Sequence, residues 1–521
     1  MTHGCVVDWK GFRMSVYFMR NCGAALVLAI SSHGAWADLT ARDVWSDWRG
    51  YITDFGYEFT GTETMVGNTL KISDMGFSVT IPEEGMTTTY SLAEMSLVEN
   101  SDGTVNITVP ATQLMTIAVQ VEDEQDVEIG IDYSQTGLSM VVSGKPGDMT
   151  YNFSAADLTL ALASLVVDQI PMPSDAANAF VSFNNMSGSA TMNVAGMRFH
   201  TGKMTASDVS FEFAAKDTDG GGMFKASGKT NDVDFSSAVK MPLNVRNSDV
   251  QAMLKSGFEF ESTFGYGISE FAVMGSGDGA DFSANGSLDS GAFQITVDQS
   301  KLAYDVHSNG LAVSAATSDL PFPLSFELAK YGLRLGIPMA NSTSLQDFAL
   351  GLTLQDLSMA DHLWSMIDPA GNLPHDPATV AVDLSGKTRV LVDFLSPDIE
   401  ETMQNLDHPP AEVHALTIKE FLVSALGARL SGIGDFTFDN DDLATFDGLP
   451  APTGSVSLDL VGANGLLDKL IAMGIISDND AMGGRMMIGM LAVPGDGDDT
   501  LKSTLEITAE GHILANGQRI K

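Results

Sequence analysis

Apolar and polar residues alternate with a period of two along most of this chain. Strict alternation is typical of β-strands that have one buried face and one face in water, as in antiparallel sheets. Because such runs follow one another with few helical interruptions, they predict a mainly β protein with an extended, curved antiparallel sheet, shaped as a trough or a sandwich. The clearest runs are Val105–Val109, Val127–Tyr133, Val209–Phe213, Phe258–Ile268, Tyr331–Ile337 and Val456–Leu460.

Short polar segments between the runs predict hairpin turns, because Gly, Asn and Asp tolerate the backbone conformations that tight turns need. These segments are "ENSDGT", "SQTG", "GKPGD", "DTDGGG", "GSGDGAD" and "HSNG". They recur at no fixed interval, which argues against a propeller or a regular solenoid. The lack of strand–helix alternation likewise argues against a doubly wound nucleotide-binding fold.

Helical spacing of apolar residues marks a few short segments, which we expect to cap the sheet. The first, residues 39–56, begins with Thr40 and Asp43 in the spacing of a capping box. Its apolar face carries Trp45 and Trp48, which either seal the end of the sheet or dock a ligand. Further helices are predicted at 248–257 and 358–367, the latter with a capping box from Ser358 to Asp361.

A helical pair is predicted near residues 464–492, and its second helix is rich in methionine. Unbranched thioether side chains such as Met486 and Met490 fill irregular apolar grooves. This helix pair therefore either covers the open edge of the sheet or contributes to a surface for apolar ligands. Phe258 and Phe260, in the longest alternating run, are further candidates for such a surface.

The N-terminus has the pattern of a secretory signal peptide, residues 1–37. Arg13 and Arg20 precede the apolar stretch 23–31, and the A-x-A signal "AWA" then predicts cleavage between Ala37 and Asp38. The predicted location is therefore the periplasm. An uncleaved membrane anchor is the alternative, but the apolar stretch is short for a membrane span.

The remaining chain has no sharply marked domain boundary. We expect an N-terminal β-rich region at 38–320 and a C-terminal one at 321–521, with one continuous domain as the alternative. Translation starts at Met1 or, given the length of the signal segment, at Met14. Cys5 and Cys22 both lie in that segment, so the mature chain is predicted to have no thiol. It has no further run long enough to span a membrane.

The formal net charge of −40 excludes several partners. Nucleic-acid binding requires clustered Lys and Arg, so we expect none. Anionic membrane surfaces are disfavoured for the same reason. The acidic loops at 277–283, 435–448 and 494–500 do not follow the order of an EF-hand, and we interpret them as solvated turns, with weak calcium contacts as the alternative.

Candidate chemistry is sparse. The G-x-S-x-G, P-loop, G-x-G-x-x-G and H-E-x-x-H patterns are absent. One cluster could bind a metal, but its spacing and prolines favour a structural crossing; it consists of Asp361, His362, Asp368, His375 and Asp376. "EGHILANGQRI" (510–520) reads as a hairpin with His512 at its rim. We therefore predict no catalytic, cofactor-binding or metal-binding residue.

Three stretches resemble a known family. They are "LTARDVWSDWRGYITDFGYEF", "LWSMIDPAGNLPHDPATVAVDLSG" and the closing segment from "LLDKLIAMGIISDNDAMGGRMM" to "EGHILANGQRI". This pattern is similar to the exported bacterial family called domain of unknown function 2125, DUF2125. The family has no assigned activity, so the resemblance implies no site residues. The central stretch and the "G-x-I-x-x-N-G" ending also look like AsmA-type envelope proteins, which implies a long sheet whose apolar trough accommodates lipids.

These observations lead to three functional hypotheses. The first is non-enzymatic binding or transfer of an apolar envelope component, such as a lipid, on the sheet. The second is a structural or interaction protein of the cell envelope, in which the sheet edge or the Trp-bearing helix docks a partner protein. The third is a hydrolase of an envelope polymer that uses paired carboxylates. The first fits the extended apolar face best, and it requires no cofactor.

Overall fold

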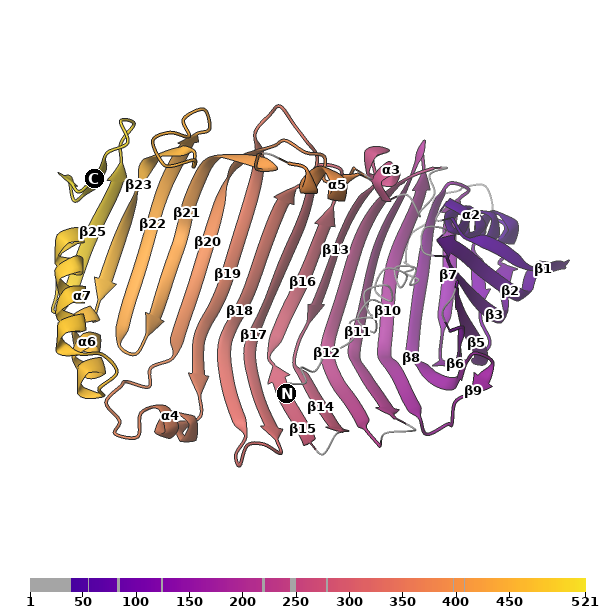
Figure 1. The fold of residues 1–521 in the computed structure, drawn as a ribbon. Helices are drawn as coiled ribbons and strands as arrows, with labels where there is room; N and C mark the ends of the chain where they lie inside the picture. The colour runs from indigo at the N-terminus through magenta and orange to yellow at the C-terminus, as the bar shows by residue number, and fades with distance from the viewer. Residues whose placement is uncertain are drawn as a thin grey trace.

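The strands form one antiparallel sheet that crosses the molecule from end to end, nearly in chain order (Figure 1). The computed structural model describes residues 39–54, 56–81, 85–122, 125–217, 221–243, 250–277, 280–396, 398–406 and 408–521. The prediction of a mainly β fold with a large antiparallel sheet is confirmed. The predicted signal peptide and its cleavage site at Ala37 and Asp38 lie outside the described residues.

The strands fall into an N-terminal set and a C-terminal set for description only. The first are β1 (Glu58–Val66), β2 (Thr69–Ile81), β3 (Met86–Glu99), β4 (Val105–Thr108), β5 (Thr112–Val121), β6 (Val127–Thr136), β7 (Ser139–Lys145), β8 (Asp148–Val167), β9 (Ile170–Pro171), β10 (Ala177–Val194), β11 (Met197–Lys216), β12 (Met223–Pro242) and β13 (Glu259–Tyr266). The others are β14 (Ser269–Gly277), β15 (Ala280–Leu288), β16 (Ser290–Val297), β17 (Lys301–Thr317), β18 (Leu324–Pro338), β19 (Gln346–Met359), β20 (Ala378–Val390), β21 (Ala411–Ala425), β22 (Ala428–Asp439), β23 (Ala451–Val461), β24 (Val493–Pro494), β25 (Thr500–Ile507), β26 (Ile513–Ala515) and β27 (Gln518–Arg519).

Several of the shorter strands are halves of one long column. β13 and β14 both pair with β12, one with each half of its length. β16 and β15 then pair with β13 and β14, and both pair with β17. In the same way β4 with β5, and β6 with β7, fill the space between β3 and β8. Counted in columns, the sheet is a simple meander.

A line of irregularities crosses the sheet where these columns divide. Along it the pairing of adjacent strands skips a residue, and the skipped residues face one another from strand to strand. We call this line the crease; it passes through Ala156, Asn185, Ser207, Asp232, Gly267, Asp289, Gly310, Ala329 and Asp356. Four of them, Asn185, Asp232, Gly310 and Asp356, have φ between 48° and 65°. Asn, Asp and Gly are the residues that tolerate this left-handed region best.

The alternation of apolar residues shifts by one position at the crease. In β8 the apolar positions are Met149, Tyr151 and Phe153 before it, and Leu158 and Leu160 after it. Phe153 and Leu158 nevertheless pack in the same hydrophobic core. One extra residue in each of the two paired strands has this effect, because it restores the side-chain direction while the register of pairing stays the same. The sheet therefore has one apolar face, which we call the inner face, and one polar face, the outer face.

At its N-terminal end the sheet curls over its own inner face and encloses helix α2 (Ala41–Asp54) (Figure 1). Val44 of α2, Leu70 and Ile72 of β2 and Tyr151 of β8 are at most 1% exposed there. The helix starts as predicted, because Thr40 Oγ1 accepts a hydrogen bond from the Asp43 N–H and the Asp43 carboxylate accepts one from the Thr40 N–H. Full burial of each such apolar side chain stabilises the fold by roughly 1.5–3 kcal/mol.

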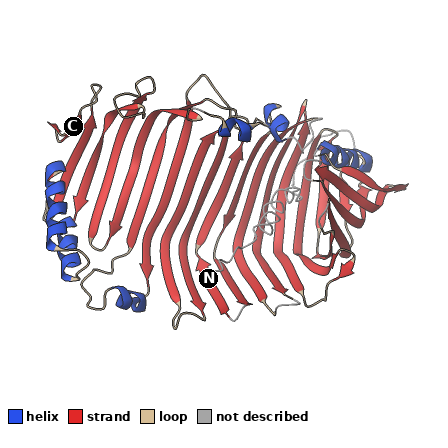
Figure 2. Ribbon diagram, viewed as in Figure 1, coloured by secondary structure: helices blue, strands red, loops and turns tan. Residues whose placement is uncertain are grey.

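The other helices lie at the opposite end and along the rims of the sheet (Figure 2). They are α3 (Val250–Lys255), α4 (Asp361–Ile367), α5 (Ile399–Gln404), α6 (Ala463–Ala472) and α7 (Asp478–Leu491). α7 begins with a capping box between Ser477 and Asp480. The predicted box of α4 is wrong: Ser358 is paired with Glu327 within the sheet, and the N-cap is Ala360. Within the described part of the chain, no helix is long and apolar enough to cross a bilayer.

Two predicted turns are not turns between neighbouring strands. "HSNG" (307–310) lies inside β17, and "SQTG" (134–137) ends at the break between β6 and β7. Both segments lie at the crease, where Gly310 and Gly137 have φ of 65° and 68°. A residue with positive φ inside a strand has the same local sequence signature as a hairpin turn, which explains the error.

Hydrogen bonding between strands also continues across the predicted domain boundary at residue 320. β17 and β18 flank that position and pair from Lys301–Pro338 to Ala315–Leu324. Few contacts normally cross a domain boundary. The pairing of β17 with β18 therefore favours the alternative of one continuous sheet through this region.

Candidate functional surface

Apolar residues form a continuous row across the inner face. The row crosses nine adjacent columns, in each of which one apolar residue stands directly opposite the next. We call it the central row; it consists of Met204, Phe235, Phe264, Phe293, Val306, Leu333, Leu352, Val382 and Phe421. At a strand spacing of about 4.8 Å, nine columns extend over about 40 Å.

A second row lies across the crease on the same face. Phe211 stands opposite Gly228, which stands opposite Phe271 and then Gly286. The ring of Phe271 comes within 2.6 Å of the place where a Cβ of Gly286 would lie. Glycine at these positions therefore provides the space in which the rings lie flat across the neighbouring strand.

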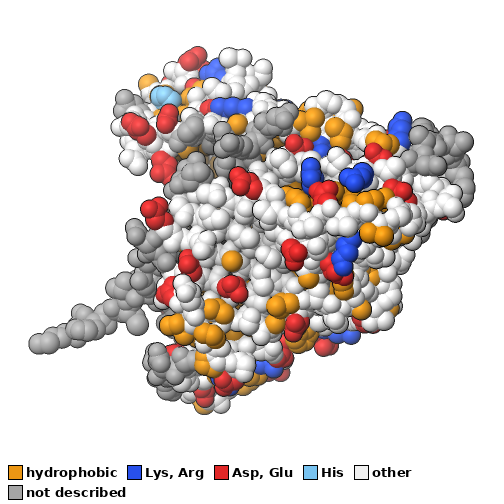
Figure 3. Space-filling model, turned by 90° about the vertical axis from the view of Figure 1, so that its right-hand side faces the viewer, with side chains coloured by type: hydrophobic (Ala, Val, Ile, Leu, Met, Phe, Trp, Pro, Cys, Tyr) orange, Lys and Arg blue, Asp and Glu red, His pale blue; other side chains and the backbone are white. Residues whose placement is uncertain are grey.

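Much of this apolar surface is open. Phe264 and Phe293 of the central row are 38% and 37% exposed, and Phe211 of the second row is 43% exposed. Viewed from its β1 end, the molecule shows acidic side chains spread over its surface with apolar side chains between them (Figure 3). Exposed apolar surface of this extent is a mark of binding sites.

The N-terminal end of the inner face is closed by α2 and a buried ion cluster. Arg198 of β11 has a side chain that is 5% exposed; it contacts Asp47 at 2.7 Å and Asp54 at 3.4 Å. Its guanidinium also lies 5.6 Å from the ring centre of Tyr51. These three partners come from one helix, so the cluster fixes α2 against β11. Removal of one member would leave a buried charge without its counterion.

Burial shifts the acid–base equilibria of the groups around this cluster. It raises the pKa of Tyr51 to about 12, although the charge of Arg198 opposes the shift. Burial first, and the same Arg198 second, lower the pKa of His200. The buried Nδ1 atom of His200 has no hydrogen-bond partner. We therefore expect the stability of the end closed by α2 to depend on pH, through His200 in acid and through Tyr51 in alkali.

At the opposite end, α7 presents methionines to solvent. Met482, Met486 and Met490 follow one another at four-residue intervals and are 59–69% exposed. Within α7 only Ala481 is buried. This stripe therefore does not pack on the sheet, and it forms a second exposed apolar surface next to β25.

The residues predicted for an apolar surface are separated in space by the fold. Trp45 is 3% exposed in the core, and the ring of Trp48 lies 6.4 Å from that of Tyr151. Both positions match the interpretation in which the tryptophans seal the end of the sheet. Phe260 lies on the inner face opposite Val239, and Phe258 precedes β13.

The histidine and carboxylate cluster near α4 is held by local contacts. The rings of Trp364 and His375 stack with centres 4.4 Å apart, and a ring nitrogen of His362 is within hydrogen-bond distance of the Pro323 carbonyl oxygen. Asp368 accepts the Leu373 N–H, which lowers the pKa of its carboxyl group. Among the described residues, no three His, Cys, Asp or Glu side chains are grouped to hold a metal ion.

The closing hairpin forms nearly as predicted. Ala515 pairs with Gln518, so Asn516 and Gly517 make a two-residue turn with φ of 50° and 79°. His512 lies before β26, where its carbonyl oxygen accepts the Thr508 N–H. Asp442 and Asp499, from the acidic loops, similarly accept hydrogen bonds from nearby backbone N–H groups.

Sequence reasoning missed the central row and the Arg198 cluster. Each strand of the row carried a recognisable alternating pattern, but which residues stand opposite one another depends on register. Arg198 is separated from Asp47 by 151 positions, and no local pattern links them.

The family comparison covers the C-terminal part of the sheet, from β13 onward. Residues 263–514 match the family model described as an uncharacterised protein conserved in bacteria, DUF2125. This part of the chain resembles that family. The DUF2125 match contains the central stretch and most of the closing one, whereas the leading stretch that begins at Leu39 lies outside it. The likeness to AsmA-type proteins stays a prediction. No curated protein and no solved structure matches the chain.

Proposed function

We propose that this protein binds or transfers an apolar envelope component, such as a lipid, on the inner face of its sheet. The central row carries the proposal, because it offers about 40 Å of continuous apolar contact. Phe264 and Phe293 in this row are 38% and 37% exposed, so an acyl chain would bury area that water now contacts. Each buried methylene would contribute about 0.8 kcal/mol.

Binding on this surface requires no reaction and no cofactor. The side chains of the central row are apolar, so they provide area and shape but no acid, base or nucleophile. Asp47 and Asp54 both bind Arg198 and are therefore already neutralised. Asp368, which is 3% exposed, accepts the Leu373 N–H in the local structure near α4. The hydrolase hypothesis has no supporting observation in the described part of the chain.

Native mass spectrometry of protein purified from its own periplasm tests the lipid proposal. We expect bound lipid in the unmodified protein and its loss in the Phe264→Asp, Phe293→Asp double variant. Met274→Asp is the matched control, because Met274 is 43% exposed but lies on the outer face beside Lys225. Absence of lipid from the unmodified protein, or equal loss in the control, would contradict the proposal.

The methionine stripe of α7 supports a second candidate function, docking of another envelope protein. Flexible thioether side chains adapt to varied apolar partners. Crosslinking in cells from a photoreactive residue at position 486 tests this. A discrete adduct that disappears in Met482→Glu, Met490→Glu would support docking, and the same variant is expected to keep its bound lipid.

Periplasmic location belongs to the same proposal. It rests on the cleavage pattern at Ala37 and Asp38. N-terminal sequencing of the protein from the periplasmic fraction is expected to begin at Asp38. Retention of the segment in the membrane fraction would favour the anchor interpretation instead.

A further inference from the structure

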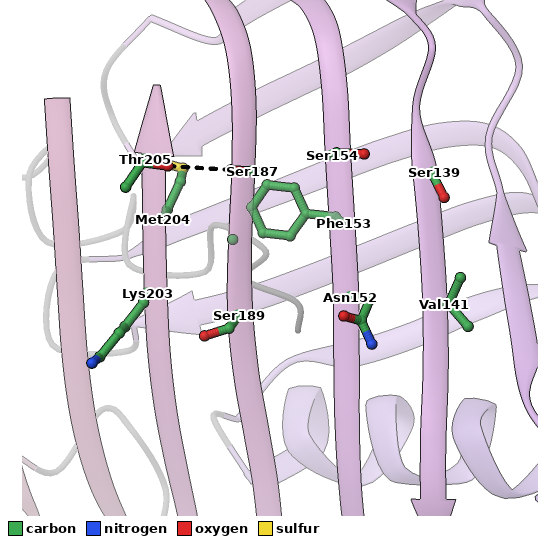
Figure 4. A pocket seen from close by; sticks show the side chains of 11 residues that line it. Ser139, Val141, Asn152, Phe153, Ser154, Ser187, Ser189, Lys203, Met204 and Thr205 are labelled. Carbon is green, nitrogen blue, oxygen red and sulfur yellow. Dashed lines mark hydrogen bonds between the residues drawn. The ribbon is translucent and has the colours of Figure 1, made fainter. Parts of the chain in front are cut away.

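A polar groove lies on the outer face, opposite the apolar surface. Its volume is about 500 Å³, within the range of small-molecule sites. It extends across β7, β8, β10 and β11, next to the crease (Figure 4). The polar side chains that line it include Asn152, Ser154, Ser187, Ser189, Lys203 and Thr205.

Asn152 has an unsatisfied acceptor in this groove. Its neighbours Tyr151 and Phe153 point into the core, so by alternation Asn152 points to the outer face. The residue is only 9% exposed, and its buried Oδ1 has no hydrogen-bond partner. Val141 and Ser189 stand opposite it on the two adjacent strands. A buried acceptor without a partner is costly, and a ligand that donates a hydrogen bond would satisfy it.

Lys203 provides a cation that the surrounding protein does not neutralise. Other outer-face lysines have carboxylate partners on the adjacent strand: Lys225 contacts Glu212 at 2.8 Å, and Lys229 contacts Asp208 at 3.3 Å. Lys203 instead stands opposite Ser189 and Ser236. It belongs to none of the ion pairs found among the described residues.

The remaining polar lining groups are hydroxyls, and Val141, Phe153, Gly188 and Met204 complete the lining. Ser187 and Thr205 share a hydrogen bond of 3.2 Å, and each hydroxyl can still accept another. Serine and threonine both donate and accept, as sugar hydroxyls do. A simple ionised carboxylate would pair with Lys203 but has no hydrogen to donate to the Asn152 oxygen. The groove therefore suits a ligand that has both hydroxyl donors and one negative charge.

We propose that this groove binds an acidic saccharide unit, a sugar ring that carries one carboxylate. A ring hydroxyl donates to Asn152 Oδ1, the carboxylate pairs with Lys203, and the serine hydroxyls contact the remaining ring oxygens. Asn152, Ser189 and Lys203 follow one another on three strands, a span of about 10 Å that a single sugar unit and the flexible lysine can bridge. This site lies on the opposite face from the lipid surface, and Met204 of the central row is the residue common to both.

A second outer groove provides a comparison. It is larger, about 690 Å³, and it is lined in part by Glu270, Glu327 and Lys229. Lys229 is already paired with Asp208. No lining atom of this groove is among the buried, unpartnered side-chain atoms of the described residues. Volume alone therefore does not distinguish the two grooves, whereas the free acceptor and the free cation do.

Calorimetric titration of the full chain with D-glucuronate and with D-glucose tests the proposal. We expect saturable binding of glucuronate and weaker binding of glucose. Lys203→Gln is expected to weaken glucuronate by about tenfold, towards the level of glucose, and Asn152→Leu to weaken both sugars by a similar factor. Lys225→Gln, the matched control on the same face, is expected to bind as the unmodified protein does.

The stability of the variants keeps the result interpretable. Asn152→Leu removes an unpaired buried acceptor, so its Tm is expected to equal or exceed that of the unmodified protein. Lys203 is exposed, and its substitution is expected to leave Tm unchanged. Phe264→Asp is expected to leave glucuronate binding intact, which separates this site from the lipid surface. No saturable binding at tens of millimolar glucuronate, or equal binding by Asn152→Leu, would overturn the proposal.

Discussion

The two ends of the inner face have the same apolar pattern but different surroundings. Tyr151 and Met149 in β8 are 1% and 2% exposed beneath α2, whereas Phe264 and Phe293 farther along the sheet are 38% and 37% exposed. The alternation in the sequence is equally clear in both regions. An alternating pattern therefore identifies an apolar face, but not what covers it. In the first region the cover is part of the chain, and in the second we propose that it is a ligand.

The largest effect is expected from the ion cluster under α2. Arg198→Met should lower the free energy of unfolding by about 3–5 kcal/mol, because it leaves Asp47 and Asp54 buried without a counterion. Arg334→Met is the control. The Arg334 side chain pairs with Asp383 and is 39% exposed, and a surface ion pair contributes at most about 1 kcal/mol to the free energy of unfolding. Urea unfolding of both variants measures the difference. Equal destabilisation would show that the two ends are not energetically distinct.

Truncation of apolar side chains compares the two regions directly. Leu70→Ala, at a position that is 0% exposed, should cost about 2–5 kcal/mol through lost burial and the cavity left behind. Phe264→Ala should cost about 1 kcal/mol or less in lipid-free protein, because water already contacts the ring. Chemical unfolding after delipidation measures both. A cost for Phe264→Ala as large as that for Leu70→Ala would mean that the open face is covered by the protein itself.

The crease should respond to backbone conformation rather than to side-chain contacts. Asn185 has φ of 48°, so Asn185→Val should cost about 1–2 kcal/mol, while Asn185→Gly should cost much less. Ser210→Val, at an ordinary strand position in β11, is expected to change stability by no more than about 0.5 kcal/mol. Thermal melts of the three variants test this order. If Asn185→Val were as stable as Asn185→Gly, the crease would not depend on the left-handed residue.

Changes of pH are expected to act on the end of the sheet that α2 closes. The pKa of His200 is lower in the folded protein than in the unfolded chain, so protonation favours unfolding and stability should fall as pH drops below the unfolded value of about 6.5. The pKa of Tyr51 is raised to about 12, so stability should also fall as pH rises from about 10 to that value. His200→Gln should remove the acid response alone, and Tyr51→Phe the alkaline one. Unfolding midpoints recorded across pH measure both.

Much of the fold could be predicted because its determinants are local. The capping boxes of α2 and α7 and the Asn516–Gly517 turn each depend on residues within a few positions of one another. Alternation likewise gave most strands and the antiparallel class. The crease could not be distinguished from hairpins, because Gly310 in the middle of β17 has the same neighbours as a turn glycine.

The candidate sites were less predictable, because they depend on contacts between distant residues. The central row requires the register of nine columns, and the polar groove requires that Asn152, Ser189 and Lys203 stand side by side. Ser189 and Lys203 are unremarkable in sequence, and only their lack of a carboxylate neighbour across the strands makes the groove distinctive. Pairing of Arg198 with Asp47 is equally long-range.

The crease also limits how such a sheet can change in length. A residue inserted into one strand would displace that strand's apolar positions relative to both neighbours, and the pairing on each side would be lost. A whole hairpin added between two columns, with one extra residue at the crease in each of its strands, would leave the other registers as they are. We therefore expect relatives of this protein to differ in size by complete pairs of strands, with a longer or shorter apolar surface of unchanged width.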